Sequence, residues 1–179
     1  MNRKKLVTEM GRMGRDEFVA SRKMPLVVVL DNIRSLHNVG SVFRTSDAFR
    51  VEKVMLCGIT ATPPSAEIHK TALGAEDVVE WQYYPDTMSA VEELLGKGYG
   101  VYAIEQVQDS IALQNFTAVE GKRYAVVLGN EVKGVQQQVV DACDGAIEIP
   151  QFGTKHSLNV SVTTGMVIWE FARILGWVK

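Results

Sequence analysis

Leu26-Val27-Val28-Val29-Leu30 is an uninterrupted run of apolar, mostly β-branched residues. Such a run predicts a strand buried on both faces, as in a parallel sheet that carries helices on each side. The polar segment Asp31–Gly40 follows directly, and Asn38 is a suitable cap for a helix that continues to about Phe49. We therefore expect the first strand and crossover helix of an α/β domain here.

Outward from this run, strand-like and helix-like patterns alternate, with turn residues between them. The expected strands are Val54–Cys57, Val101–Ile104, Tyr124–Leu128 and Ala146–Ile149, with Val78 and Val79 as a short extended piece. The expected helices are Thr87–Lys97, Val135–Cys143 and Leu158–Leu175, and a loop is expected at Pro63, Pro64 and Ser65. This alternation predicts an α/β domain with a mostly parallel sheet flanked by helices.

Length and composition favour one packed, cytoplasmic domain. The 179 residues are 46% hydrophobic and 22% charged, which argues against a disordered chain. The two cysteines, Cys57 and Cys143, are too few for a disulfide scaffold or a zinc knuckle. Because nothing near Met1 resembles a signal peptide and no apolar stretch suits a membrane span, we expect no membrane association.

Charge is distributed unevenly along the chain. Residues 1–23 hold seven Lys/Arg against three acids, whereas the net charge of the whole chain is −2. We therefore divide the chain into a basic N-terminal arm, residues 1–24, and a domain, residues 25–179. A basic arm on an acidic body suits contacts with nucleic-acid phosphates, and it is equally typical of a solvated helix end.

Several common catalytic patterns are missing from the sequence. The glycines of Gly96–Gly100 run from a helix into a strand, whereas a dinucleotide loop runs from a strand into a helix. There is no Walker A sequence, no HExxH pattern and no Gly-x-Ser-x-Gly elbow. Nucleotide hydrolysis, metal-dependent hydrolysis and Ser–His–Asp catalysis therefore have no support in the sequence.

Three polar, glycine-bearing segments fall at expected strand ends: Asp31–Gly40, Gly129–Gly134 and Gln151–Asn159. Ligands of such sheets bind beyond the carboxyl ends of the strands, so we look for chemistry there. Arg44, nearly two turns into the first helix, is expected to point toward the strand end, where a guanidinium grips phosphate or carboxylate. The alternative is a surface arginine paired with an acid.

The other two segments also allow two interpretations. Glu131 places an acid beside exposed amides between Gly129 and Gly134, unless this segment is only a strand-to-helix connection. Ser157 and Asn159 stand at the start of the final helix, where free amides and short polar side chains hold ligands or simply cap the helix.

Together the three segments resemble the motifs of the SpoU (TrmH-like) branch of the SPOUT RNA methyltransferases. Asn38-Val39-Gly40 with Arg44 is similar to the first family motif, and Leu128-Gly129-Asn130-Glu131 with Gly134 to the second. Ile149-Pro150 with the run Ser157–Val162 is similar to the third. The motifs occur in the family's order, and the resemblance covers about residues 25–176.

The resemblance implies transfer of a methyl group from S-adenosylmethionine to a ribose 2′-hydroxyl of tRNA or rRNA. It implies no metal, because a methyl group on a sulfonium already carries its own leaving group. It also implies a deep C-terminal trefoil knot and a homodimer in which each active site draws on both subunits. The residues matched to catalytic positions are Arg44, Asn38, Glu131, Ser157 and Asn159. Those matched to the cofactor pocket are Gly129, Asn130, Ile149 and Leu158, with Glu105 closing one side.

In the family the first-motif arginine acts on the 2′-hydroxyl with an RNA phosphate nearby, which makes Arg44 the expected essential residue. Substrate selection is left to the basic arm, the dimer surface or another partner. The runner-up interpretation is an RNA-binding module of the same fold that has lost catalysis. A nucleotide-binding oxidoreductase would need a phosphate loop after Leu30, and Asp31–Gly40 lacks the glycine spacing for one.

Overall fold

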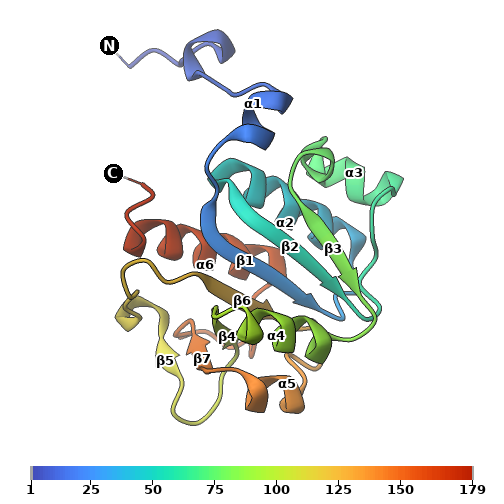
Figure 1. Ribbon diagram of the computed structural model, residues 1–179, viewed down its shortest axis with the longest axis vertical. Coiled ribbons are helices and arrows are strands. Elements are labelled where there is room, and N and C mark those ends of the chain that lie inside the picture. Colours follow the sequence, from blue (N-terminus) through green and yellow to red (C-terminus); the bar gives the residue numbers. More distant parts are fainter. Residues whose placement is uncertain (1, 179) are drawn as a thin grey trace.

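A single parallel sheet organises the chain (Figure 1). A computed structural model describes residues 2–178, so the predicted arm and domain each include one residue, 1 and 179, outside the described range. The strands are β1 Met24–Asp31, β2 Val51–Cys57, β3 Trp81–Tyr84, β4 Gly100–Ile104, β5 Ile111–Ala112, β6 Tyr124–Leu128 and β7 Gly145–Glu148. They follow the order β3-β2-β1-β6-β4-β7-β5, and every pairing is parallel.

Helices cover both faces of this sheet. The α-helices are α1 Arg15–Ala20, α2 Leu36–Phe49, α3 Ala66–Ala72, α4 Thr87–Gly96, α5 Gln137–Ala142 and α6 Val160–Ile174. Short 3₁₀ turns are η1 Val7–Met10, η2 Ala75–Asp77 and η3 Leu113–Asn115. Helices α2 and α6 lie over one face, and α4 and α5 lie over the other (Figure 1).

The first apolar run is buried on both sides, as predicted. Leu26, Val28 and Leu30 face the core under α2 and α6, while Val27 and Val29 face the core under α4 and α5. Successive side chains of a strand point to opposite faces, so a continuous apolar run fills both layers at once. The predicted mostly parallel α/β sheet is confirmed.

Helix α2 begins earlier than the sequence analysis predicted. Its N-cap is Ser35, whose side-chain oxygen accepts a hydrogen bond from the Asn38 backbone N–H at 3.3 Å. The prediction of Asn38 as the cap was therefore wrong, because a suitable residue stands three positions earlier. The Asn38 side chain is consequently free for longer-range contacts.

Other elements were missed or misplaced. The residues Val78 and Val79, expected to be extended, follow η2 and precede β3 instead. The predictions did not include α3, β3 or β5, and the final helix begins at Val160 rather than at Leu158. Within residues 2–178, no helix combines the length and the apolar character that a membrane crossing requires.

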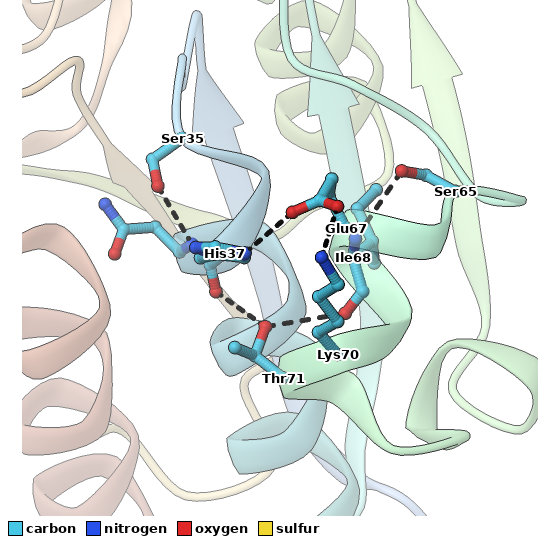
Figure 2. Close-up of polar contacts among 8 residues, drawn as sticks. Ser35, His37, Ser65, Glu67, Ile68, Lys70 and Thr71 are labelled. Carbon is cyan, nitrogen blue, oxygen red and sulfur yellow. Dashed lines mark hydrogen bonds and ion pairs between the residues drawn. The ribbon is translucent and has the colours of Figure 1, made fainter.

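Gly40 in α2 allows this helix to approach α3 closely. A Cβ atom at Gly40 would lie 2.1 Å from Thr71 Oγ1 and 2.3 Å from the Ile68 carbonyl oxygen. The Thr71 hydroxyl donates to the His37 carbonyl at 2.8 Å, and His37 Nε2 lies 3.0 Å from Glu67 Oε2 (Figure 2). Gly40 of the first motif therefore has a packing role, which fixes α2 against its neighbour.

Gly40→Ala is expected to destabilise the protein by about 1–3 kcal/mol, because a backbone carbonyl cannot move aside as a flexible side chain would. The measurement is the free energy of unfolding in urea. Gly96→Ala, near the end of α4, is the matched control because its added Cβ meets nothing within 4 Å. Equal stability of the Gly40 variant and this control would contradict the packing role.

Candidate active site

A cavity of about 450 Å³ opens where β4, β6 and β7 end. Its walls are formed by residues 104–107, 128–135, 148, 149 and 151, together with residues 156–158, two residues of α5 and the first turn of α6. Parallel strands bring their carboxyl ends to one edge, so segments far apart in the sequence meet here. Two of the predicted polar segments, Gly129–Gly134 and Gln151–Asn159, contribute directly to this cavity.

The five residues matched to the cofactor pocket all line this cavity: Glu105, Gly129, Asn130, Ile149 and Leu158. Of the residues matched to catalytic positions, Glu131 and Ser157 also line it. The structure thus brings seven of the ten residues to one cavity wall.

The loop after β6, residues 129–135, folds back on itself. The Asn130 N–H donates to the Gly134 carbonyl at 3.2 Å, and the Gly134 N–H donates to the Asn130 carbonyl at 2.8 Å. A Cβ atom at Gly129 would lie 2.1 Å from both the Gly134 carbonyl carbon and the Val135 nitrogen. The space beside Gly129 is thus filled by the chain's own backbone, so this position requires glycine.

The side chain of Asn130 bonds both to its own loop and to the segment that follows β1. Its Oδ1 accepts from the backbone N–H groups of Val132 (2.8 Å) and Lys133 (3.1 Å), and its Nδ2 donates to the Asn32 carbonyl (3.0 Å). These bonds occupy the amide on both sides. Asn130 therefore shapes the cavity wall, since its side-chain amide and both of its backbone groups are hydrogen-bonded within the protein.

Glu105 holds the other side of the loop. One carboxylate oxygen accepts from the Val135 N–H at 2.9 Å and the other from the Gln106 N–H at 2.9 Å. Gly134 has a φ of +67°, and a Cβ there would lie 2.1 Å from Glu105 Oε2. This position therefore requires glycine both for its left-handed backbone and for the close approach of the carboxylate.

Asn38, Glu131 and Asn159 join the three motif segments at the rim of the cavity. Asn38 Nδ2 donates to Glu131 Oε1 at 2.9 Å, and Asn159 Nδ2 donates to Asn38 Oδ1 at 3.3 Å. Asn159 also caps α6, since its Oδ1 accepts from the N–H groups of Ser161 (2.9 Å) and Val162 (3.3 Å). One asparagine thus starts the final helix and links it to α2.

Arg44 does not lie at this cavity. Its side chain is exposed on α2, beside Gly74, Ala75 and Val78, which precede β3. Helix α2 begins at the carboxyl edge of the sheet and runs away from it, so a residue two turns along it is carried from the strand ends. The expectation that Arg44 points toward the strand end of its own chain was therefore wrong.

The sequence analysis did not single out several cavity residues. Gln106 follows β4, and its Nε2 donates to the His156 carbonyl at 3.3 Å, while Thr163 lies in the first turn of α6. Gln106 lies just after a strand and Thr163 lies at the start of a helix, and these positions could have indicated both residues from the sequence. Within residues 2–178, no group of three or more His, Cys, Asp or Glu side chains is placed to hold a metal ion.

Known proteins are similar to this chain in sequence and in fold. The model of the SpoU rRNA Methylase family matches residues 25–169. The chain is 32% identical over 167 residues to tRNA (guanosine(18)-2′-O)-methyltransferase of Thermus thermophilus, covering 93% of this chain and 84% of that protein. It is 33% identical over 150 residues to 23S rRNA (guanosine-2′-O-)-methyltransferase of Neisseria meningitidis, covering 83% of this chain and 58% of that protein.

Solved structures of similar proteins have the same fold as this chain. The TrmH/SpoU tRNA modifying enzyme of A. aeolicus superposes with a TM-score of 0.80 at 26% identity, covering 91% of this chain and 81% of that one. The AdoMet-bound rRNA methyltransferase of Sinorhizobium meliloti gives 0.79 at 25% identity, covering 86% and 58%. Because the family match includes all three motif segments, the chain belongs to the SpoU rRNA methylase family.

Proposed function

We propose that this protein transfers a methyl group from S-adenosylmethionine to a ribose 2′-hydroxyl of tRNA or rRNA. The observation that carries this proposal is the cavity at the carboxyl ends of β4, β6 and β7, walled by the second and third motif segments. The relatives described above are named as 2′-O-methyltransferases of tRNA and 23S rRNA, and both names specify guanosine. We therefore propose guanosine as the methylated nucleotide.

The cavity fits S-adenosylmethionine, which supplies a methyl group activated by a positive sulfonium. Its volume of about 450 Å³ suits a small ligand. The carboxylates of Glu105, Glu131 and Glu148 line it, and they complement a positive ligand. Backbone groups at Gly129, Ile149 and Leu158 would hold the adenine, with Ser157 supporting cofactor and substrate.

In the proposed reaction, the 2′-oxygen would bond to the methyl carbon while the carbon–sulfur bond breaks with its electron pair going to sulfur, and the hydroxyl proton would pass to an RNA phosphate or to water. Asn38 and Asn159 hold the rim where the ribose enters, and Glu131 orients Asn38 through their 2.9 Å hydrogen bond. Arg44 positions the hydroxyl and stabilises the developing charge, while an RNA phosphate assists proton removal. A guanidinium stays protonated in proteins, so we do not assign Arg44 as the base.

We propose a homodimer in which each active site draws on both subunits, so that Arg44 of one subunit reaches the cavity of the other. Arg44 lies outside the cavity of its own chain, on a helix that packs beside α6. Helix α6 presents Val162, Met166 and Trp169 to solvent, with Trp169 53% exposed and its ring 6.0 Å from that of Phe49 on α2. An apolar patch over these two helices is typical of a subunit interface.

Trp169→Glu is expected to convert a dimer into monomers and to lower methyl transfer at least about tenfold, because a buried unpaired carboxylate opposes the interface. Sedimentation velocity measures the assembly state. Val119→Glu is the matched control, since Val119 is 64% exposed and lies in the loop before β6, outside both α2 and α6. A Trp169 variant that remains dimeric would refute this interface.

The basic arm is proposed to contact RNA. Helix α1 is anchored by the buried Phe18, while Lys4, Lys5 and Arg12 are exposed. Positive side chains on an otherwise acidic body would attract phosphates without forming a broad electrostatic footprint. Recognition of a shaped RNA loop agrees with this distribution. We propose a cytoplasmic location, in keeping with such a substrate.

We also propose the deep C-terminal trefoil knot of the family. Two features support it. The late strand β6 lies between β1 and β4, and β7 lies between β4 and β5, so the chain returns into a sheet that earlier strands have begun. Helix α6 then packs back against α2.

The activity is tested by incubating the protein with radiolabelled S-adenosylmethionine and total RNA from a strain that lacks the gene. We expect label in one 2′-O-methylated nucleotide after nuclease digestion, and mapping the labelled fragment identifies the RNA. Calorimetry with S-adenosylmethionine alone is the parallel measurement. Binding without transfer to any RNA would contradict the activity, and absence of binding would contradict the cofactor assignment.

A further inference from the structure

Asp31, at the end of β1, is a fully buried acid that the proposed mechanism does not use. Its Oδ1 accepts from Thr87 Oγ1 at 2.6 Å, from Asn32 Nδ2 at 2.8 Å and from Gln136 Nε2 at 2.8 Å. Its Oδ2 accepts from the Gln136 backbone N–H at 2.9 Å. All four partners donate, so the side chain acts as an acceptor throughout.

No cation is paired with Asp31 among the described residues. Thr87 is the first residue of α4 and Gln136 is the N-cap of α5, so two helix N-termini face this carboxyl group. Burial raises the pKa of the neighbouring Cys57 thiol to about 12, which keeps that group neutral. Donors and helix ends thus compensate a buried acid that would otherwise be costly.

The same cluster holds the cavity loop from behind. The Gln136 N–H bond fixes the chain immediately after residues 129–135, and Asn130 Nδ2 donates to the carbonyl of Asn32 beside Asp31 at 3.0 Å. Asn32 has a left-handed φ of 56°, and its Oδ1 accepts from the Ile59 N–H at 3.1 Å. Both ends of the loop are therefore attached to Asp31 and its neighbour, while Asp31 itself does not line the cavity.

We propose that Asp31 is a positioning residue for S-adenosylmethionine binding. It acts through Gln136 and holds the backbone of residues 129–135 in the shape that receives the cofactor. This inference rests on the proposed function, because it assigns a role within the same cavity. It predicts that cofactor affinity depends on a hydrogen-bond donor at position 136 facing an acceptor at position 31.

The test uses Asp31→Asn, Gln136→Glu and the double variant that combines them. Asp31→Asn turns one acceptor into a donor that opposes Gln136, and Gln136→Glu places a carboxylate against Asp31. Each single variant is expected to weaken S-adenosylmethionine binding about tenfold or more in calorimetry. In the double variant the amide and carboxylate are exchanged, so a donor again faces an acceptor and part of the lost affinity returns.

Asp144→Asn is the matched control, because Asp144 Oδ2 also accepts a backbone N–H, that of Val101 at 2.8 Å, at the start of β4 rather than at the cavity. We expect its cofactor affinity to stay within about twofold of the original protein. Gln136 is exposed, so Gln136→Glu remains a test even where Asp31→Asn does not fold.

The outcomes separate this inference from the proposed function. Unchanged affinity in both single variants would overturn the role of Asp31, and so would losses that simply multiply in the double variant. A comparable loss in Asp144→Asn would also overturn it, because general destabilisation would then explain the effect. Failure of the unsubstituted protein to bind S-adenosylmethionine would instead overturn the proposed function and this inference with it.

Discussion

Arg44→Ala is expected to lower methyl transfer to RNA about 10²–10³-fold while the affinity for S-adenosylmethionine stays unchanged. The arginine is absent from the cavity wall of its own chain, so its removal leaves the cofactor contacts of residues 129–135 intact. It is also exposed, so little stability should be lost. Single-turnover methylation with saturating cofactor measures the first quantity, and calorimetry measures the second.

Arg123→Ala is the control. Arg123 is an exposed arginine directly before β6, at the amino ends of the strands, and it is paired with Glu52 of β2. Arg44→Lys should retain part of the activity, because it keeps the charge and loses the two-pronged geometry. Full methyl transfer by Arg44→Ala would contradict the assignment of this residue.

Mixed dimers test whether Arg44 acts on the second subunit. An Arg44→Ala chain and a cavity-defective Gly129→Ala chain, co-expressed with different tags, form one site with an intact cavity and an intact arginine. That site should restore about half the activity of the original dimer, whereas each variant alone stays inactive. Inactivity of the mixed dimer would mean that Arg44 serves its own chain.

Local sequence patterns were sufficient to predict the strands that are buried on both faces and the polar segments that follow strands. The runs Leu26–Leu30 and Tyr124–Leu128 became β1 and β6 because each fills two core layers, which few other structures allow. The carboxyl-end rule brought Gly129–Gly134 and Gln151–Asn159 to one cavity without any three-dimensional information. Fold class and cavity position were therefore predictable from sequence.

Elements with weak local signals were not predictable. Strand β3 presents two exposed residues in its centre and β5 is two residues long, so neither shows a usable hydrophobic period. Asn38 alone was predicted as the cap of α2, and the geometry shows that the helix uses Ser35. That choice matters, because it leaves the Asn38 side chain free to bind Glu131.

Side-chain partners were the least predictable part of the site. The sequence could not show that the Asn130 side chain bonds both to its own loop and to Asn32, or that the hydrogen bonds of Asp31 extend to Gln136, 105 residues away. The sequence also could not show the direction of α2. This helix runs away from the strand ends, so Arg44, two turns along it, lies far from them. Such contacts depend on tertiary packing and leave no short-range signal.

Gly129→Ala is expected to weaken S-adenosylmethionine binding about 100-fold or more and to destabilise the protein by about 3 kcal/mol. The added Cβ would lie 2.1 Å from two backbone atoms, Gly134 C and Val135 N, and neither can move without breaking the hairpin-like loop. Displacing Val135 would also break its 2.9 Å bond to Glu105 and shift the wall on both sides. Gly153→Ala is the control, because that glycine follows β7 near the cavity and its Cβ would meet nothing within 4 Å. Calorimetry and urea unfolding measure both effects, and a Gly129 variant that binds the cofactor as tightly as Gly153→Ala would show that the loop tolerates the displacement.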